Sequence, residues 1–169
     1  MKATDVIADG FGRIREVVNE VVEGLSAQDL NARIDPAANS ITWLVWHLAR
    51  VQDDHVADAA DLEQVWHAQE WAARFALPLP AASTGYGHTA RQAGTVRVDS
   101  GELLLGYFEA VHEQTTRFVR GLAAADLDRV VDEGWDPPVT LGVRLVSVLA
   151  DDLQHAGQAA FVRGVLERR

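Results

Sequence analysis

Residues 41–60 read ITWLVWHLARVQDDHVADAA. One apolar face recurs at helical spacing and consists of Ile41, Leu44, Leu48 and Val51. Because seven residues are nearly two helical turns, an adjacent stripe carries Trp43, His47, Asp54 and Asp58. Asn39 or Ser40 can cap the first turn. We therefore expect a long helix from residue 41 to about residue 60, with ionisable side chains beside its buried face.

Three further stretches with helical periodicity give four long helices in all, and they cover residues 4–24, 101–121 and 140–166. We expect a shorter helix over residues 63–75, a long loop over residues 81–98 and a polar connection over residues 122–138. The sequence thus predicts an all-α four-helix bundle with an extra short helix and a long loop between the second and third long helices. We expect one domain over residues 1–169.

The composition excludes several classes of function. The chain has 169 residues with 25 acidic and 15 basic ones, a formal net charge of -10, which would repel a phosphate backbone. It has no cysteine, so a metal must be held by imidazole and oxygen. The first 15 residues mix charged and apolar side chains, unlike a signal peptide, and no stretch is apolar enough to span a membrane. We expect a cytoplasmic protein with no nucleic-acid or membrane partner.

Asp151 and His155 lie four residues apart in the fourth long helical segment. This spacing places both side chains on one face, one turn apart. His47 flanks the apolar stripe of another helix, so the two helices could bring the three groups to one ion. Two imidazoles and one carboxylate suit zinc, nickel, iron(II) or manganese and leave coordination positions open. A hydrogen-bonded polar cluster in the bundle core is the alternative interpretation of the spacing.

Asp152 is a second candidate for the carboxylate ligand. It lies three residues before His155, a spacing that also permits a shared ion, and it points nearer the centre of the apolar face than Asp151 does. We expect Asp152 instead to form a salt bridge with an arginine such as Arg50 or Arg144, because an unpaired carboxylate in a core is costly.

Two short motifs resemble the DinB-like metalloprotein superfamily. The first is ITWLVWHLA at residues 41–49, in which His47 follows an aromatic residue, and the second is His155-Ala156-Gly157-Gln158. The superfamily carries a further ligand, usually His, one turn before the second motif, and here that position is Asp151. A carboxylate there is similar to the branch that contains mycothiol-dependent maleylpyruvate isomerase. The resemblance spans nearly the whole chain, helix by helix.

The resemblance implies a bundle of the DinB-like type in which His47, Asp151 and His155 bind one divalent ion, zinc or nickel. Characterised members are thiol-dependent transferases and isomerases that use bacillithiol, mycothiol or glutathione, often as dimers. The ion would bind the thiol of the cofactor and lower its pKa, which presents a thiolate nucleophile. We therefore expect a small-molecule substrate, a low-molecular-weight thiol such as mycothiol, and a capacity to form a homodimer.

Three polar residues are secondary candidates. We expect His55 to be a hydrogen-bonded core histidine, and a role in a pocket or beside a metal ligand is the alternative. Tyr86 and His88 are flanked by glycines in the 81–98 loop. Such a segment is typical both of a substrate mouth and of a plain surface loop.

Two functions follow from these patterns. The first is a metal-dependent thiol S-transferase or isomerase acting on small electrophiles. The second is a non-catalytic bundle with a degenerate site, which binds a metal, a small molecule or a partner. The two differ in what the metal does: in an enzyme the ion responds to added thiol, whereas in a binding module its removal costs only stability.

Overall fold

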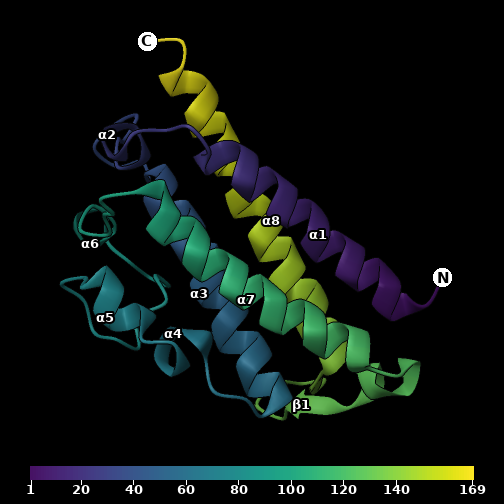
Figure 1. The fold of residues 1–169 in the computed structure, drawn as a ribbon. Helices are drawn as coiled ribbons and strands as arrows, with labels where there is room; N and C mark the ends of the chain where they lie inside the picture. The colour runs from purple at the N-terminus through teal and green to yellow at the C-terminus, as the bar shows by residue number, and fades with distance from the viewer.

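Four long helices form the body of the computed structural model, which describes all 169 residues (Figure 1). They are α1 (Ala3–Val22), α3 (Ile41–Ala60), α7 (Gly101–Gly121) and α8 (Leu141–Leu166). Both α1 and α3 pack along α7 and α8 but have few contacts with each other, so they occupy opposite corners. The predicted all-α four-helix bundle is confirmed.

Short elements fill the connections between the long helices. They are α2 (Ala27–Leu30), α4 (Val65–Ala68), α5 (Trp71–Phe75), α6 (Ala90–Ala93), the 3-10 helix η1 (Ala124–Asp128), β1 (Val130–Asp132) and β2 (Val139–Thr140). The short helix predicted at residues 63–75 is two helices, α4 and α5, because Glu70 adopts a left-handed φ of 58° between them, and the predicted 81–98 loop contains α6. The polar connection predicted before α8 contains η1 and leads into an antiparallel hairpin of β1 and β2.

Side-chain caps mark where three of the four long helices begin. The side chains of Ser40, Ser100 and Thr140 each accept a hydrogen bond from the backbone N–H three residues further on. Each bond satisfies a donor that the first helical turn leaves unpaired. Of the two candidates for the cap of α3, Ser40 is therefore the one used, and the helix ends at the left-handed Asp61, whose φ is 54°.

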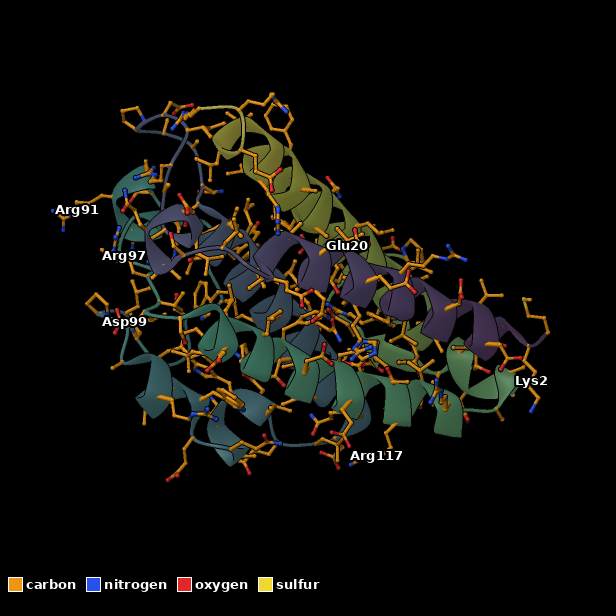
Figure 2. All side chains as sticks on the ribbon, turned by 45° about the horizontal axis from the view of Figure 1, so that its top comes forward. Lys2, Glu20, Arg91, Arg97, Asp99 and Arg117 are labelled. Carbon is orange, nitrogen blue, oxygen red and sulfur yellow. The ribbon has the colours of Figure 1, made fainter.

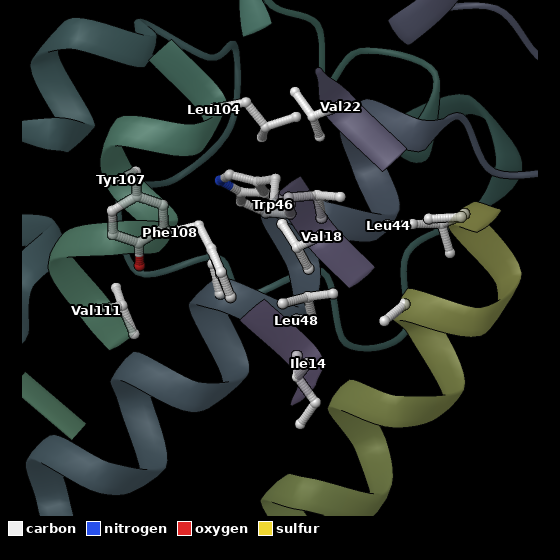
Figure 3. Close-up of a cluster of buried hydrophobic side chains, with 14 of the residues drawn as sticks. Ile14, Val18, Val22, Leu44, Trp46, Leu48, Leu104, Tyr107, Phe108 and Val111 are labelled. Carbon is white, nitrogen blue, oxygen red and sulfur yellow. The ribbon is translucent and has the colours of Figure 1, made fainter. Parts of the chain in front are cut away.

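The core lies between the four long helices and is filled by aliphatic and aromatic side chains (Figure 3). Its fully buried members include Ile14, Val18, Leu48, Leu104 and Phe108. In α3 the burial extends around most of the helix, because the segment with α4, α5 and α6 covers the side that faces away from α1 (Figure 1). Polar side chains of α3 are therefore interior groups that require partners.

A buried ion pair fastens this covering segment to α3. Arg50 Nη1 lies 3.6 Å from Asp53 Oδ2, and both side chains are fully buried. The carboxylate of Asp53 accepts hydrogen bonds of 2.8 Å from the backbone N–H groups of Val65 and Trp66. Arg50 Nε donates to the carbonyl oxygen of Ser83 over 3.2 Å. The segment between α3 and α6 is thus hydrogen-bonded to one turn of α3 through Val65 and Trp66 near its start and through Ser83 near its end.

The outside of the molecule carries most of its charged side chains. Figure 2 shows Lys2, Glu20, Arg91 and Arg117 projecting away from the bundle, and all four are exposed. Helix length and hydropathy together leave no helix suited to crossing a membrane.

Candidate metal centre

His47, Asp151 and His155 meet between α3 and α8. Each offers one ligand-type atom, and these atoms all lie within 4.8 Å of one another. The rings of the two histidines stand edge to face with their centroids 4.6 Å apart. The fold therefore brings together the three side chains that the sequence singles out, and their role as metal ligands stays a prediction. We call them the His-Asp-His triplet.

His47 is held in one tautomer by the loop that covers α3. Its Nδ1 lies 2.6 Å from the carbonyl oxygen of Thr84. A carbonyl oxygen only accepts, so Nδ1 carries the hydrogen and Nε2 keeps a free lone pair. Trp43, one turn earlier on α3, stacks on the ring at 4.5 Å between centroids. A histidine oriented through its second nitrogen in this way is typical of metal sites.

Asp151 and His155 supply the other two groups from α8. His155 Nδ1 donates to the carbonyl oxygen of Asp151 over 2.8 Å, which leaves its Nε2 lone pair free. Asp151 Oδ2 is buried and lies 3.2 Å from the same nitrogen, but the hydrogen of that nitrogen is directed at the carbonyl oxygen. A buried carboxylate oxygen that has only this shared contact is poorly satisfied, and a cation would satisfy it. Two imidazole lone pairs and this oxygen fit the donor set of a divalent ion.

The charge states of the triplet also suit a cation. Burial lowers the pKa of His47 and keeps its ring neutral. Burial acts to raise the pKa of Asp151, but the neighbouring His155 and His47 outweigh it and lower that pKa. Burial acts to lower the pKa of His155, but its contacts with Asp151 prevail and raise it. At neutral pH, His155 is therefore the member of the triplet at which protons would compete most strongly with a cation.

Asp152 lies outside the triplet, in the core of the bundle. Its side chain is fully buried, and neither carboxylate oxygen has a hydrogen-bond partner. The predicted salt bridge is wrong, because Arg50 pairs with Asp53 and Arg144 pairs with Asp132. Burial, and then repulsion by the preceding carboxylate, raises the pKa of Asp152 well above its ordinary value. Consecutive residues of a helix point about 100° apart, which separates the two aspartates.

A cavity of about 430 Å³ opens beside the triplet. Its lining consists of His47, Val51, Asp54, His55, Thr84, Tyr86, Ser147, Val148 and Asp151. Tyr86 is 93% exposed and stands at its rim. His55 is half-buried in the wall, so the expectation of a core histidine is corrected in favour of the pocket alternative.

His88 does not line the cavity and instead fastens the loop onto α3. The indole nitrogen of Trp43 donates to His88 Nδ1 over 3.2 Å, so in the neutral ring His88 Nε2 carries the hydrogen. That nitrogen lies 2.9 Å from the hydroxyl of Ser83. Of the two loop residues singled out in the sequence, Tyr86 borders the cavity and His88 has a structural position.

Gly85 permits the loop to lie this close to the triplet. Its φ is 96°, and a Cβ at this position would lie 2.6 Å from His47 Nδ1. The glycine content of the loop was visible in the sequence, but the side chain against which Gly85 packs was not. The contact with the carbonyl of Thr84 could not be predicted either, because every residue type has a backbone carbonyl.

Comparisons with known proteins agree with this fold. A family model described as mycothiol-S-transferase matches residues 8–168. A solved structure, the crystal structure of a conserved protein from Enterococcus faecalis, superposes with a TM-score of 0.93 at 32% sequence identity, covering 100% of this chain and 99% of the other. No curated protein sequence gives a significant match.

Proposed function

The chain belongs to the mycothiol-S-transferase family, and from that premise we propose that it is a metal-dependent enzyme that joins the sulfur of a small thiol, mycothiol in the first instance, to a small electrophile. The observation that carries the proposal is that Asp151 Oδ2, which is buried and has only the shared contact with His155 Nδ1, lies beside two free imidazole lone pairs and a cavity. The family match also confirms the resemblance to DinB-like proteins.

His47, Asp151 and His155 would hold the ion, with zinc or nickel as the candidates. When bound, such an ion supplies a Lewis acid that lowers the pKa of a coordinating thiol and favours the thiolate at neutral pH. Three protein ligands leave room for one more, and the cavity is where that ligand would enter.

The remaining residues orient the triplet and exclude water from it. Thr84 fixes the His47 ring through its carbonyl oxygen. The indole of Trp43 lies 4.5 Å from the His47 ring and 6.1 Å from the His155 ring, centroid to centroid. Trp43 is buried and does not line the cavity, so it covers the side of the triplet that solvent does not reach.

The test begins with the metal content of protein purified without an affinity-tag metal step. We expect about one equivalent of a divalent ion in the wild type and loss of it in His47→Ala and in His155→Ala. His112→Ala is the matched control, because His112 is half-buried on α7 outside the cavity. The metal-loaded wild type should then accelerate the conjugation of mycothiol to monochlorobimane.

Two results would contradict the proposal. A wild type that is metal-free and takes up no ion on titration would exclude the metal site. A protein that binds the ion, accelerates no thiol transfer and merely loses stability when the ion is removed would instead support the non-catalytic binding bundle.

A further inference from the structure

His55 lies on α3 eight residues after His47, which is roughly 12 Å of helix rise and about 80° around the helix axis. Both line one cavity, and His55 is the only histidine of that lining outside the His-Asp-His triplet. A molecule that extends from the triplet along the cavity would therefore meet the imidazole of His55.

The tautomer of His55 is set by an arginine from another helix. Nη1 of Arg144, in the first turn of α8, lies 3.0 Å from His55 Nδ1. A guanidinium only donates, so Nδ1 accepts and the neutral ring carries its hydrogen on Nε2. Nη2 of Arg144 in turn lies 2.8 Å from Asp132 Oδ2 on β1. Asp132 on the hairpin and Arg144 at the start of α8 thus hold the His55 ring in one tautomer.

The Nε2–H group of His55 is free to donate into the cavity. It has no hydrogen-bond partner within the protein, and it is not among the fully buried polar atoms. Burial and then the charge of Arg144 lower the pKa of His55, against the opposing effect of Asp54, Asp58 and Asp151. At neutral pH the ring is therefore an uncharged donor rather than a cation.

The charges of the lining indicate which ligand this donor suits. The lining contains two carboxylates, Asp54 and Asp151, and no lysine or arginine. Asp54 accepts a 2.7 Å hydrogen bond from Gln64 Nε2. This bond positions the Asp54 carboxylate at the cavity wall. In the metal-loaded protein Asp151 would be a ligand of the ion, so Asp54 is the lining carboxylate left to repel an anionic ligand, whereas an uncharged ligand with an acceptor atom would not be repelled.

We propose that His55 is a catalytic residue that donates a hydrogen bond from Nε2–H to an acceptor atom of an uncharged electrophile, and that Arg144 is its positioning residue. This inference rests on the proposed thiol transfer. With iodoacetamide as electrophile, the thiol releases its proton to solvent and the sulfur electron pair forms the S–C bond. The C–I bond breaks and iodide leaves with its electron pair. His55 keeps its proton throughout and binds the amide oxygen.

The first test is ¹⁵N NMR of the histidine rings in metal-loaded wild type, assigned with His55→Phe. We expect a protonated Nε2 and an unprotonated Nδ1 for His55, and a shift of Nε2 on titration with acetamide as an unreactive probe. In Arg144→Leu, both tautomers should be populated. A hydrogen on Nδ1 in the wild type, or an Nε2 signal that acetamide does not move, would overturn the inference.

The second test compares iodoacetamide with iodoacetate, which differ in charge but not in leaving group. With mycothiol as thiol, the enzymatic kcat/KM should favour iodoacetamide by about tenfold beyond the uncatalysed ratio. His55→Phe should lower kcat/KM for iodoacetamide by about 100-fold, with metal content and the KM for mycothiol unchanged. His55→Gln retains an N–H donor and should recover much of the loss. His112→Phe should behave as wild type.

The outcomes distinguish a failure of the role of His55 from a failure of the proposed thiol transfer. If His55→Phe retains wild-type kinetics, the catalytic role of His55 is wrong while the transfer reaction stands. If the metal-loaded wild type transfers no thiol to any electrophile, the proposed function fails, and the acetamide titration still decides whether His55 is a donor to a ligand in the cavity.

Discussion

The carbonyl oxygen of Thr84 lies 2.6 Å from Nδ1 of His47, so a loop residue 37 positions further along the chain orients one member of the His-Asp-His triplet. This bond ties the geometry of the triplet to the segment between α3 and α7. It also makes the neighbouring glycine sensitive to substitution.

Gly85→Ala should disturb the metal site from outside it. A Cβ would lie 2.6 Å from His47 Nδ1, and φ is 96°, so the loop must move and release Thr84. We expect metal affinity to fall roughly 10- to 100-fold and stability to fall by about 1–3 kcal/mol. Chelator competition and urea denaturation measure the two effects.

Gly87→Ala is the control for this substitution. Its φ is 70°, but a Cβ at this position would have nothing within 4 Å, so the substitution costs backbone strain alone. Metal affinity should stay at the wild-type value. Equal loss of affinity in both variants would show that the contact with His47 is not the cause.

Metal binding should weaken as the pH falls. The pKa of His155 is raised above its ordinary value, so protons compete with the ion at this ligand first, while the lowered pKa of His47 leaves that ring neutral. Below the pKa of His155, apparent affinity should drop about tenfold per pH unit. Chelator competition between pH 5.5 and 8 measures this slope.

Asp151→Asn tests the cause of that pH dependence. Asp151 raises the pKa of His155, so the variant should bind more weakly at pH 8 but begin its decline at lower pH. A decline that starts at the same pH in both proteins would contradict the assignment.

Asp152→Asn should stabilise the protein. The folded pKa of Asp152 is raised above the unfolded one, so the folded chain binds its proton more tightly. The free energy of unfolding is then lowered as pH rises above the unfolded pKa, and the loss continues up to the folded pKa. At pH 7.5 the metal-free variant should gain roughly 1–3 kcal/mol.

Urea denaturation of the wild type and of Asp152→Asn at pH 4.5 and 7.5 checks the sign of this pH dependence. The advantage of the variant should shrink at pH 4.5, where the carboxylate of the unfolded chain also becomes protonated. An advantage that is constant with pH, or a destabilised variant, would mean that Asp152 has a partner.

Arg50→Met should strongly destabilise the protein, because it leaves the carboxylate of Asp53 buried without its cation. We expect a loss of about 3–5 kcal/mol. Limited proteolysis should then cut between α3 and α7 first. The free energy of unfolding of the double variant Arg50→Met/Asp53→Leu should depend less on pH than that of the single variant, because the double variant buries no charge at these two positions.

Local chemistry determined the elements and the candidate ligands. Helical periodicity located α1, α3, α7 and α8. The four-residue spacing of Asp151 and His155 places them one turn apart in any α-helix, whatever surrounds it. The absence of cysteine limits any metal ligands to imidazole and oxygen. The inferences about the helices succeeded because each depends on residues that are neighbours in the chain.

Tertiary structure alone decided the contacts between distant segments. It placed Asp151 at the triplet and Asp152 in the core, although the angular positions of both on the helix were readable beforehand. It also brought the Thr84 carbonyl to His47, across 37 positions, and Arg144 to His55, across 89. A hydrogen bond between two segments depends on how the helices pack and where the loop crosses them. That packing is a property of the whole core, and no local pattern of residues encodes it.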